Sequence, residues 1–568
     1  MSRFTVYGSR VKEGGLAPAS SNPAMQDQKQ PQRIIIIGGG ITGLAAGHRL
    51  LERATEAGRE LDVVLLEASS RPGGVLKSYD REGFLIEAGA DSFISEKPEA
   101  IDLVRRLGIA SRLIETNEQH RRSFIVRNGR LLPVPEGFQL LAPSRFWPFV
   151  TTDIFSWPGK ARMAMDLLIP RRRITNGSDD ESLAQFVRRR LGREAFERMA
   201  QPMIAGIYTA DPEKLSLRAT LPRFLEMERV HGSVIRAMWK QRRGSSPTRG
   251  PQTGSPAGVG AVKEGSESRL DSQRTYGSLP KKGVSGARYS LFLSFDKGIQ
   301  VLVDELVKGI ANCELRIADS MSEQRILLNT FVEKLAIDRS LKGQRGLPKW
   351  KVTTNHNETF EADAVCLAVP AYVAASLLRE VDPELARLLD RISYASTATI
   401  HLAYQRAEVP HPLDGFGFVV PFVENRSLLA CTFSSVKFAG RAPADHVLLR
   451  AFVGGALQPD MFELDEDEMV RRVRADLREL LRIETAPLFT VVEKWRSSMP
   501  QYHVGHLELV SQIQSQLSGI PGLNLAGNSY AGAGIPDCIR SGEQAADELL
   551  DLRFPDGPPS FDRQPDLA

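Results

Sequence analysis

Cysteine is scarce in this 568-residue chain, which contains only four. They are far apart and form no C-x-x-C pair: Cys313, Cys366, Cys431 and Cys538. This spacing argues against a disulfide framework or a zinc site and indicates a reducing compartment. Only two of the nine histidines, His503 and His506, lie close together, and no acidic residue stands at ligand spacing from them. We therefore expect structural histidines and no metal centre.

An excess of charge of one sign is also missing. The net charge is +4, which gives no reason to expect a nucleic acid as a partner. No apolar run reaches the roughly 18 residues that a transmembrane helix needs. The longest run, Ala364–Leu378, contains a proline, and we expect a buried strand followed by a turn there.

Three segments lack the apolar pattern of a folded domain. Residues 1–30 have neither helical periodicity nor an apolar stretch, so we expect a flexible N-terminal extension rather than a secretory signal. Residues 241–287 are rich in Gly, Ser, Pro and charge and predict a disordered insertion, and residues 553–568 form a Pro-rich tail. We expect a cytoplasmic protein, with peripheral membrane contact as an open possibility. The few acidic residues of the extension leave a mitochondrial location as the weaker alternative.

A strand, a helix and a second strand are predicted near the N-terminus. Arg33–Ile37 ("RIIII") is typical of a strand buried on both faces of a parallel sheet. Residues 42–55 have the pattern of a helix, and Leu61–Glu67 ("LDVVLLE") predicts the next strand, which completes a βαβ unit. Later strand-like segments, "FVEKLAI", "KWKVTT" and "DAVCLAV", fit either a meander or strands that rejoin the first sheet.

The turn between the first strand and the helix carries the pattern G-x-G-x-x-G at Gly38, Gly40 and Gly43. The first glycine permits a tight turn, the second lets a pyrophosphate approach the backbone, and the third lets helix and strand pack closely. The helix N-terminus then offers free N–H groups to the phosphates. Glu67 ends the second strand 24 residues after Gly43 (67 − 43), close to the usual spacing. This context favours a dinucleotide site over a merely structural turn.

The residues after the second strand indicate which dinucleotide is bound. The string E-A-x-x-R-x-G-G, formed by Glu67, Ala68, Arg71, Gly73 and Gly74, resembles flavoprotein oxidases and desaturases of the amine oxidase type. In that group the arginine and the glycine pair lie along the diphosphate and ribityl chain of FAD. The resemblance therefore implies FAD, and the alternative is a surface turn.

The C-terminal part supplies a second half of the expected site. We expect a strand at Leu523–Ala526, a turn at Gly527 and a helix over Ile539–Leu552, with Asp537 as its N-cap candidate. A helix N-terminus aimed at the flavin would stabilise negative charge on the reduced ring. The two ends of the chain are thus expected to converge on one cofactor.

Several longer stretches resemble the protoporphyrinogen and coproporphyrinogen III oxidase family of flavoproteins. They include "EAGADSFISEKPEAIDLVRRLGI", "IVRNGRLLPVPEGF", "AGIYTADPEKLSLRATLPRF" and "LAGNSYAGAGIPDCIRSGEQAA". The similar regions are 33–240 and 288–552. The resemblance implies an α/β fold in which a Rossmann-like FAD-binding domain carries a mixed-sheet substrate domain and a smaller helical domain.

The expected domains are discontinuous. Residues 30–112, 290–370 and 490–552 would build the FAD-binding domain, and 113–146 with 371–489 the substrate-binding domain. Residues 147–240 would form the helical, membrane-associating domain. Trp147, Phe149, Phe155 and Trp157 cluster near prolines and suit either an interfacial anchor or a contact between domains.

The resemblance also implies contacts with both ligands. Cofactor contacts are expected at Gly38, Gly40, Ile41, Thr42, Gly43, Glu67, Ala68, Arg71, Gly73, Gly74, Lys77, Gly89, Ala90, Val332, Trp495, Gly527, Asn528, Ile535, Pro536 and Asp537. Gly206 matches the family's glycine-containing loop beside the substrate, and Phe416 an aromatic that stacks on the tetrapyrrole or is simply core. Ser123 stands where eukaryotic members have a carboxylate-binding arginine, so Arg122 becomes the candidate for that role. The alternatives are another basic residue in this role and a solvated basic turn at Arg121 and Arg122.

The implied reaction is the oxidation of a porphyrinogen to a porphyrin in haem biosynthesis. Hydride would pass from a meso carbon to flavin N5 in two-electron steps, with molecular oxygen as final acceptor, and no general base is assigned. The C-terminal segment inclines the expectation to protoporphyrinogen IX, with coproporphyrinogen III as the alternative. Another flavin amine oxidase or desaturase and a non-catalytic FAD-binding scaffold stay open, as does a homodimer.

Overall fold

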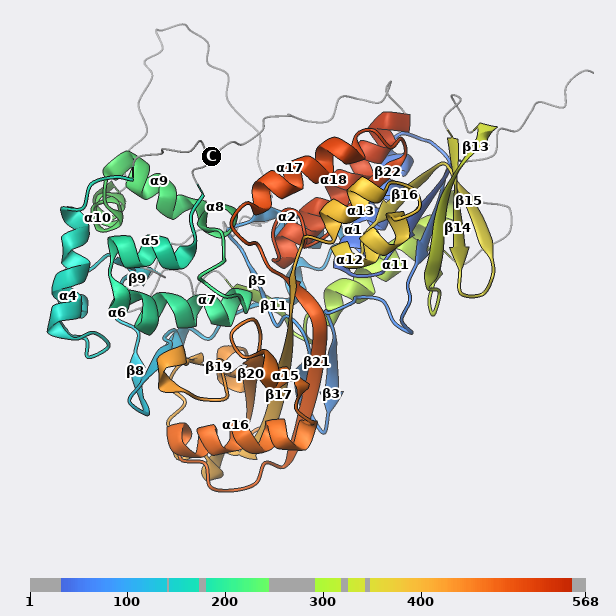
Figure 1. The fold of residues 1–568 in the computed structure, drawn as a ribbon. Helices are drawn as coiled ribbons and strands as arrows, with labels where there is room; N and C mark the ends of the chain where they lie inside the picture. The colour runs from blue at the N-terminus through green and yellow to red at the C-terminus, as the bar shows by residue number, and fades with distance from the viewer. Residues whose placement is uncertain are drawn as a thin grey trace, which may run out of the picture.

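The computed structural model describes residues 32–139, 142–172, 180–244, 292–317, 325–342 and 348–553. The expected extension at 1–30, the expected tail except Arg553, and nearly all of the expected insertion lie outside these residues. Figure 1 shows three parts: a parallel sheet with its helices, a helical part, and a second, larger sheet with one long helix across it.

The first sheet is five-stranded and parallel, in the order β12-β2-β1-β16-β22. Its strands are β1 (Gln32–Ile37), β2 (Leu61–Leu66), β12 (Ile326–Leu327), β16 (Ala364–Leu367) and β22 (Leu523–Leu525). The strands expected at 33–37, 61–67 and 523–526 are confirmed within a residue or two. The sheet joins the beginning, the middle and the end of the described chain, because β16 pairs with both β1 and β22.

Alternate isoleucines of β1 face opposite sides of this sheet. Ile34 and Ile36 pack with the helices α1 (Ile41–Glu56), α2 (Pro98–Arg106), α11 (Gln300–Ile317) and α18 (Ile535–Arg553). Ile35 and Ile37 pack with α12 (Ala371–Leu378), α13 (Pro383–Leu389) and α17 (His506–Leu517). A strand covered on both faces needs apolar side chains at every position, which explains the unbroken run.

The segment after β16 corrects one expectation. The turn expected within Ala364–Leu378 is instead helix α12, whose N-cap is Pro370. Its sequence, "AYVAASLL", consists mainly of alanine and leucine, which are strong helix formers, and proline is compatible with the start of a helix. The preceding strands β13 (Val332–Lys342), β14 (Pro348–Thr354) and β15 (Thr359–Ala362) form an antiparallel meander. Both alternatives for this region therefore occur, since β16 rejoins the first sheet.

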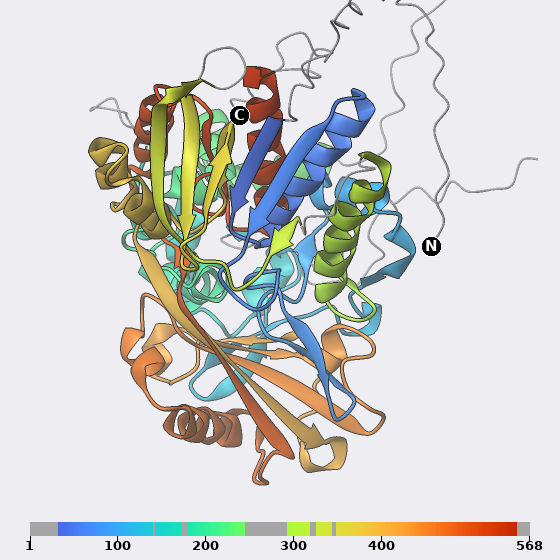
Figure 2. The same ribbon diagram turned by 90° about the vertical axis from the view of Figure 1, so that its right-hand side faces the viewer.

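The second sheet has seven strands in the order β21-β17-β20-β19-β18-β7-β8. They are β7 (Phe124–Arg127), β8 (Arg130–Pro133), β17 (Tyr394–Gln405), β18 (Gly417–Val419), β19 (Ala430–Phe433), β20 (His446–Gly454) and β21 (Phe489–Pro500). The β7–β18 pair is parallel and the others are antiparallel. Figure 2 shows the long strands β17 and β21 running from beside the first sheet to the far end of the molecule. Residues 490–500, grouped above with the cofactor segments, lie in this sheet.

The two faces of the seven-stranded sheet differ in character. One face is apolar and is covered by α16 (Glu466–Leu481), which buries Met469, Val473 and Leu477 against it. The other face carries Thr399, Arg450 and Trp495 and meets residues 77–91 of the cofactor part. The contact includes the antiparallel pair β3 (Ser78–Arg81) and β4 (Phe84–Glu87).

The helical part comprises the described residues 146–172 and 180–244. Its helices include α3 (Phe146–Thr151), α4 (Trp157–Ala164), α5 (Leu183–Arg190), α7 (Gln201–Tyr208), α8 (Leu217–Thr220), α9 (Pro222–His231) and α10 (Val234–Gly244). They enclose an apolar core of their own with a buried Arg190–Asp166 ion pair at 2.5 Å. Among the described helices, here and elsewhere, we find none with the length and apolar character needed to span a bilayer.

Candidate active site

Two glycines of the first motif are required by the fold itself. Gly38 has φ +107°, and a Cβ there would stand 2.4 Å from the carbonyl oxygen of Ala368. A Cβ on Gly43 would stand 1.9 Å from the carbonyl oxygen of Gly38. Neither contact is tolerable, so these glycines let β1, α1 and the end of β16 approach one another.

Gly40 is different, because no atom lies within 4 Å of a Cβ built on it. It is the N-cap residue of α1, and its backbone forms a parallel bridge with Gly73. Gly73 and Gly74 both have positive φ, and the Gly73 N–H donates to the carbonyl of Gly39 at 2.7 Å. The space beside Gly40 is therefore open at the N-terminus of a helix, where a phosphate group is favoured.

The residues that follow β2 tie the glycine turns together. The Glu67 carboxylate accepts hydrogen bonds from the N–H of Gly39 at 2.6 Å and of Ser69 at 2.8 Å, while Ala68 is exposed. Arg71 donates to the carbonyls of Pro72 and Leu76 at 3.0 Å and of Gly74 at 2.5 Å. Arg71 thus shapes the turn by holding its carbonyls, and burial lowers the pKa of its guanidinium.

The N-termini of α1 and α18 lie against each other. A Cβ on Gly542 of α18 would stand 2.2 Å from the carbonyl oxygen of Thr42 in α1. Helix α18 begins at Ile535, so the expected start at Ile539 is wrong. Proline is compatible with a first helical turn, and Pro536 therefore allows the earlier start.

Asp537 consequently lies in the first turn of α18 rather than at its N-cap. Its buried carboxylate is paired with Lys97 at 2.5 Å and Arg540 at 2.8 Å. Gly527, at the end of β22, has φ +137° and no atom within 4 Å of a built Cβ. Asn528 follows, and its carbonyl accepts a hydrogen bond from Tyr502. A second open glycine turn thus adjoins the first.

We call the glycine turns at 38–43, 73–74 and 527, together with the N-termini of α1 and α18, the cradle. Residues 77–91 connect this cradle to the seven-stranded sheet. Lys77 pairs with Glu493 at 2.9 Å. The carbonyl of Ala88 accepts from Thr399 Oγ1 at 3.1 Å and Trp495 Nε1 at 2.9 Å, and the carbonyl of Gly89 accepts from Arg450 Nη2. Trp495 and Gly89, both expected to contact the cofactor, are thereby brought together.

Two other expected cofactor residues contact the cores on either face of the first sheet. Ala90 is half-buried and packs against the core that contains α1 and α18. Val332 opens β13 and is 4% exposed in the core on the opposite face, which also contains Leu66.

A buried ionic cluster surrounds Gly89 and was not predicted from the sequence. Lys437 pairs with Asp91 at 2.8 Å, and Arg441 with Glu87 at 3.3 Å. Burial raises the pKa of Glu87 to about 7 against the opposing charge of Arg441. Burial also disfavours the charged form of Asp91, but the charges of Lys437 and Arg450 lower its pKa. These partners come from distant segments, so only the acidic pair within "EAGAD" could have suggested a charged site.

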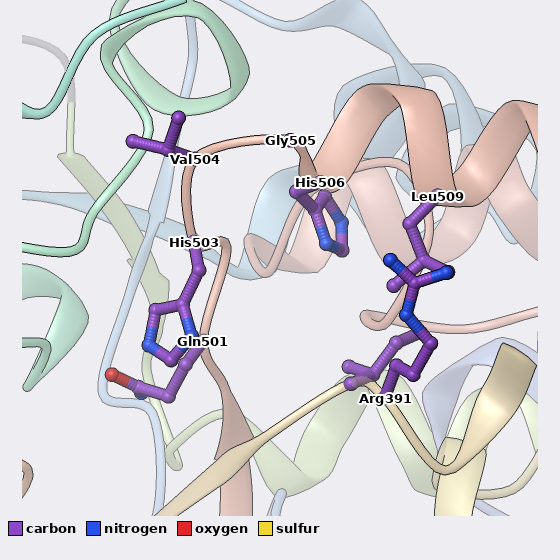
Figure 3. A pocket seen from close by; sticks show the side chains of 8 residues that line it. Arg391, Gln501, His503, Val504, Gly505, His506 and Leu509 are labelled. Carbon is purple, nitrogen blue, oxygen red and sulfur yellow. The ribbon is translucent and has the colours of Figure 1, made fainter.

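A small pocket lies behind the C-terminal glycine turn, where β21 leads into α17 (Figure 3). Its volume is about 140 Å³, which is too small for a tetrapyrrole, since drug-sized ligands occupy pockets of about 300 Å³ or more. Its wall includes His506, which stacks on Tyr502 with ring centroids 4.3 Å apart. The Tyr502 hydroxyl contacts Asn528 and Gly532. Burial lowers the pKa of His506 to about 4, so a neutral ring supports this turn.

The three expected substrate residues lie at the seven-stranded sheet. Gly206 is in helix α7, not in a loop, and a Cβ there would be 3.5 Å from Val419 Cγ1. Phe416 precedes β18 and is 4% exposed. Its N–H donates to the carbonyl of Arg122 at 2.8 Å, so Phe416 and Arg122 are neighbours. The Arg122 guanidinium is half-exposed and paired with Asp414.

The cradle meets the requirements of FAD. Two glycine turns leave open space at the N-termini of two packed helices, and a carboxylate stands at the end of β2. Residues around Gly40 and Gly73 would hold the diphosphate, and the turn at Gly527 would adjoin the flavin. An α/β fold with this double glycine cradle and a separate mixed sheet defines a flavin-dependent oxidoreductase.

Comparison with known proteins agrees. Residues 41–550 match the family described as flavin containing amine oxidoreductase, and the chain belongs to that family. Its cofactor is FAD. The fold resembles a crystal structure from Exiguobacterium provisionally named a protoporphyrinogen oxidase, with TM-score 0.72, 28% identity, and coverage of 92% of this chain and 99% of the other. A putrescine oxidase shares the fold at TM-score 0.59 and 16% identity.

Relatives of similar length carry two names. A coproporphyrinogen III oxidase from Bacillus subtilis is 33% identical over 93% of this chain and 100% of its own length. One from Propionibacterium freudenreichii is 34% identical over 91% of this chain and 90% of its own length. Protoporphyrinogen oxidase 2 from Arabidopsis thaliana is 27% identical over 91% of this chain and 94% of its own length.

Proposed function

We propose that this oxidoreductase converts a porphyrinogen to a porphyrin in haem biosynthesis, with molecular oxygen as final electron acceptor and coproporphyrinogen III as the leading substrate. The observation that carries the proposal is similarity over nine-tenths of the chain to relatives named as porphyrinogen oxidases. The C-terminal segment alone favours protoporphyrinogen IX. The relatives named for coproporphyrinogen III are 33% and 34% identical, against 27% for the Arabidopsis protein, which favours the other substrate.

The bound FAD supplies a hydride acceptor. The chain's own residues have the tasks of holding the cofactor, orienting the macrocycle and excluding water. Gly206 and Phe416 lie beside β18, and other strands of the same sheet contact residues 77–91, so a macrocycle between them and the cofactor would contact both parts. No described side chain is assigned as a general base, because positioning is the main requirement for transfer from a meso carbon.

The substrate's carboxylates need cationic partners. Arg122 is half-exposed and lies beside Phe416, so we propose that it binds one propionate of the substrate. The propionate would either replace Asp414 as the ionic partner of Arg122 or bind Arg122 together with Asp414. Coproporphyrinogen III has four propionates and protoporphyrinogen IX has two. A cationic group at the substrate site is therefore more important for binding coproporphyrinogen III than for binding protoporphyrinogen IX.

The function is tested by giving the flavin-loaded protein each porphyrinogen separately and following porphyrin fluorescence and oxygen consumption. We expect both signals with coproporphyrinogen III and a smaller rate with protoporphyrinogen IX. Turnover of amines or polyenes instead would identify another flavin oxidase or desaturase. A flavin that no donor reduces would identify a binding scaffold.

We also propose peripheral membrane contact through an apolar patch on α3, α4 and the turn after them. Its members are Phe146, Trp147, Trp157, Met165 and Leu168, each at least half exposed. Trp147 and Trp157 are 72% and 69% exposed, and aromatic rings of this kind favour the bilayer interface. The buried free thiols of Cys366, Cys431 and Cys538 support a reducing location such as the cytoplasm, with mitochondria as the weaker alternative.

Vesicle sedimentation tests this contact. Trp147→Ser together with Trp157→Ser should remove most of the vesicle-bound protein. Phe422→Ser, which changes an exposed phenylalanine outside the patch, should leave it bound. Equal binding of the double variant and the unmodified chain would refute the assignment. A homodimer is a separate question, which sedimentation equilibrium would decide.

A further inference from the structure

Arg450 on β20 is a buried cation without an ionic partner. The residue is 4% exposed, its Nη2 donates to the carbonyl of Gly89, and its Nε has no hydrogen-bond partner. Within the described residues no carboxylate oxygen lies within the 4 Å of an ion pair. Burying an unpaired charge is costly, so a chain that retains one usually places it beside an anionic group.

The charges around Arg450 do not balance it. Lys437, Arg441 and Arg450 contribute three positive charges, and Asp91 and Glu87 offer two carboxylates. The charge of Asp296 also acts on Arg441, but Asp296 is paired with Arg112 at 2.9 Å. Asp91 and Glu87 are each paired with another cation of the cluster, and Glu87 has a pKa of about 7. The His401 side chain, beside Arg450 in the sheet, stays neutral because burial and the Arg450 charge hold its pKa well below the ordinary value. The cluster therefore keeps an excess positive charge.

This charge is attached to the backbone of the cofactor segment. Three strands of the seven-stranded sheet each send one donor to adjacent carbonyls: Thr399 and Trp495 to Ala88, and Arg450 to Gly89. A Cβ on Gly89 would stand 1.7 Å from the carbonyl of Val75, so this backbone is also confined from the opposite side. We call these three hydrogen bonds to Ala88 and Gly89 the clamp. The clamp leaves the Gly89–Ala90 peptide little freedom to rotate.

We propose that Arg450 is a positioning residue for the flavin: it fixes the Gly89–Ala90 peptide against the bound cofactor and supplies a buried positive charge that raises the reduction potential of the ring. The inference rests on the assignment of Gly89 and Ala90 to the cofactor wall. Transfer of a hydride from a substrate carbon would move two electrons and one proton to the ring, which would gain one negative charge, while the carbon loses the C–H bond and the macrocycle releases a pyrrole N–H proton to solvent. A nearby cation favours that reduced state.

The test measures the reduction potential of the holoenzyme against a redox dye in three variants. Arg450→Gln keeps a donor for the Gly89 carbonyl and removes the charge. Arg450→Lys keeps the charge, and Thr399→Val removes a neighbouring hydrogen bond of the clamp without changing charge. We expect Arg450→Gln to shift the two-electron equilibrium at least tenfold toward the oxidised flavin, which is about 30 mV for two electrons. Arg450→Lys and Thr399→Val should stay within threefold of the unmodified enzyme.

An unchanged potential in Arg450→Gln overturns the proposal, as does a shift of equal size in Thr399→Val, which would mark a merely structural clamp. A change confined to KM for the porphyrinogen would assign Arg450 to a substrate carboxylate instead and would also overturn it. If Arg450→Gln does not fold with flavin, the proposal is tested with Arg450→Lys alone. A two-electron equilibrium within threefold of that of the unmodified enzyme supports the proposal, and a tenfold shift toward the oxidised flavin refutes it. Loss of flavin from the unmodified protein would instead contradict the cofactor site.

Discussion

Gly40 and Gly43 should respond oppositely to the same added methyl group. In Gly43→Ala the new Cβ would stand 1.9 Å from the Gly38 carbonyl, whereas carbon contacts normally lie near 3.5–4.0 Å. The backbone of α1 or β1 must move, and overpacking of this kind costs about 1–3 kcal/mol. In Gly40→Ala the methyl meets no atom within 4 Å, so the apoprotein should stay within about 0.5 kcal/mol of the unmodified chain.

Although Gly40→Ala should leave the stability of the apoprotein nearly unchanged, it should weaken the binding of FAD. A phosphate oxygen hydrogen bonded to the backbone comes to about 2.9 Å, and a methyl group in the same space would prevent that approach. A charge-assisted hydrogen bond contributes about 1.5–3 kcal/mol, so the dissociation constant for FAD should rise at least tenfold.

The assay is denaturant unfolding of apoprotein together with flavin titration, with Gly519→Ala as control. Its Cβ would meet only the Gln516 carbonyl, at 3.4 Å. Unchanged FAD affinity in Gly40→Ala, or unchanged apoprotein stability in Gly43→Ala, would refute this division of roles.

Three further outcomes are expected. Gly40→Asp should purify colourless, because a carboxylate would face the diphosphate; a yellow variant would contradict the cradle. The pKa of Glu87 rises from 4.5 to about 7 on folding, so the folded chain binds more protons than the unfolded chain between these values and its stability falls as pH rises through them. The shift of 2.5 (7 − 4.5) corresponds to about 3 kcal/mol, and Glu87→Gln should flatten this part of the stability profile; an unchanged slope would disprove the assignment. Arg122→Gln should raise KM for coproporphyrinogen III severalfold with little change in kcat. Asp414→Asn, which removes the ionic partner of Arg122, should not raise KM. Equal KM values in Arg122→Gln and the unmodified enzyme would exclude Arg122 from substrate binding.

The sequence predicts the glycine cradle well because its signals are local. The isoleucine run of β1, the glycine spacing and the acidic end of β2 lie within 36 residues (32–67), and the structure assembles them in that order. The helix starting at Ile535 is a different case. Its first turn was missed although Pro536 favours a helix start, because the glycine-rich segment before it suggested a longer loop.

The polar face of the seven-stranded sheet could not be predicted. Arg450 and Gly89 are 361 residues apart, and neither belongs to a pattern that points to the other. Their contact depends on the register of β17 with β20 and β21, which tertiary packing determines. Likewise, Gly206 lies in α7 because an apolar segment packed on β18 favours a helix over the expected loop.

Porphyrinogen oxidation by this chain is tested most directly by anaerobic mixing of the purified, flavin-loaded protein with coproporphyrinogen III, followed by admission of oxygen. We expect the yellow flavin absorbance to bleach as fluorescent porphyrin forms, and oxygen to restore the yellow colour. Flavin that stays oxidised in the presence of both coproporphyrinogen III and protoporphyrinogen IX would contradict the proposed function.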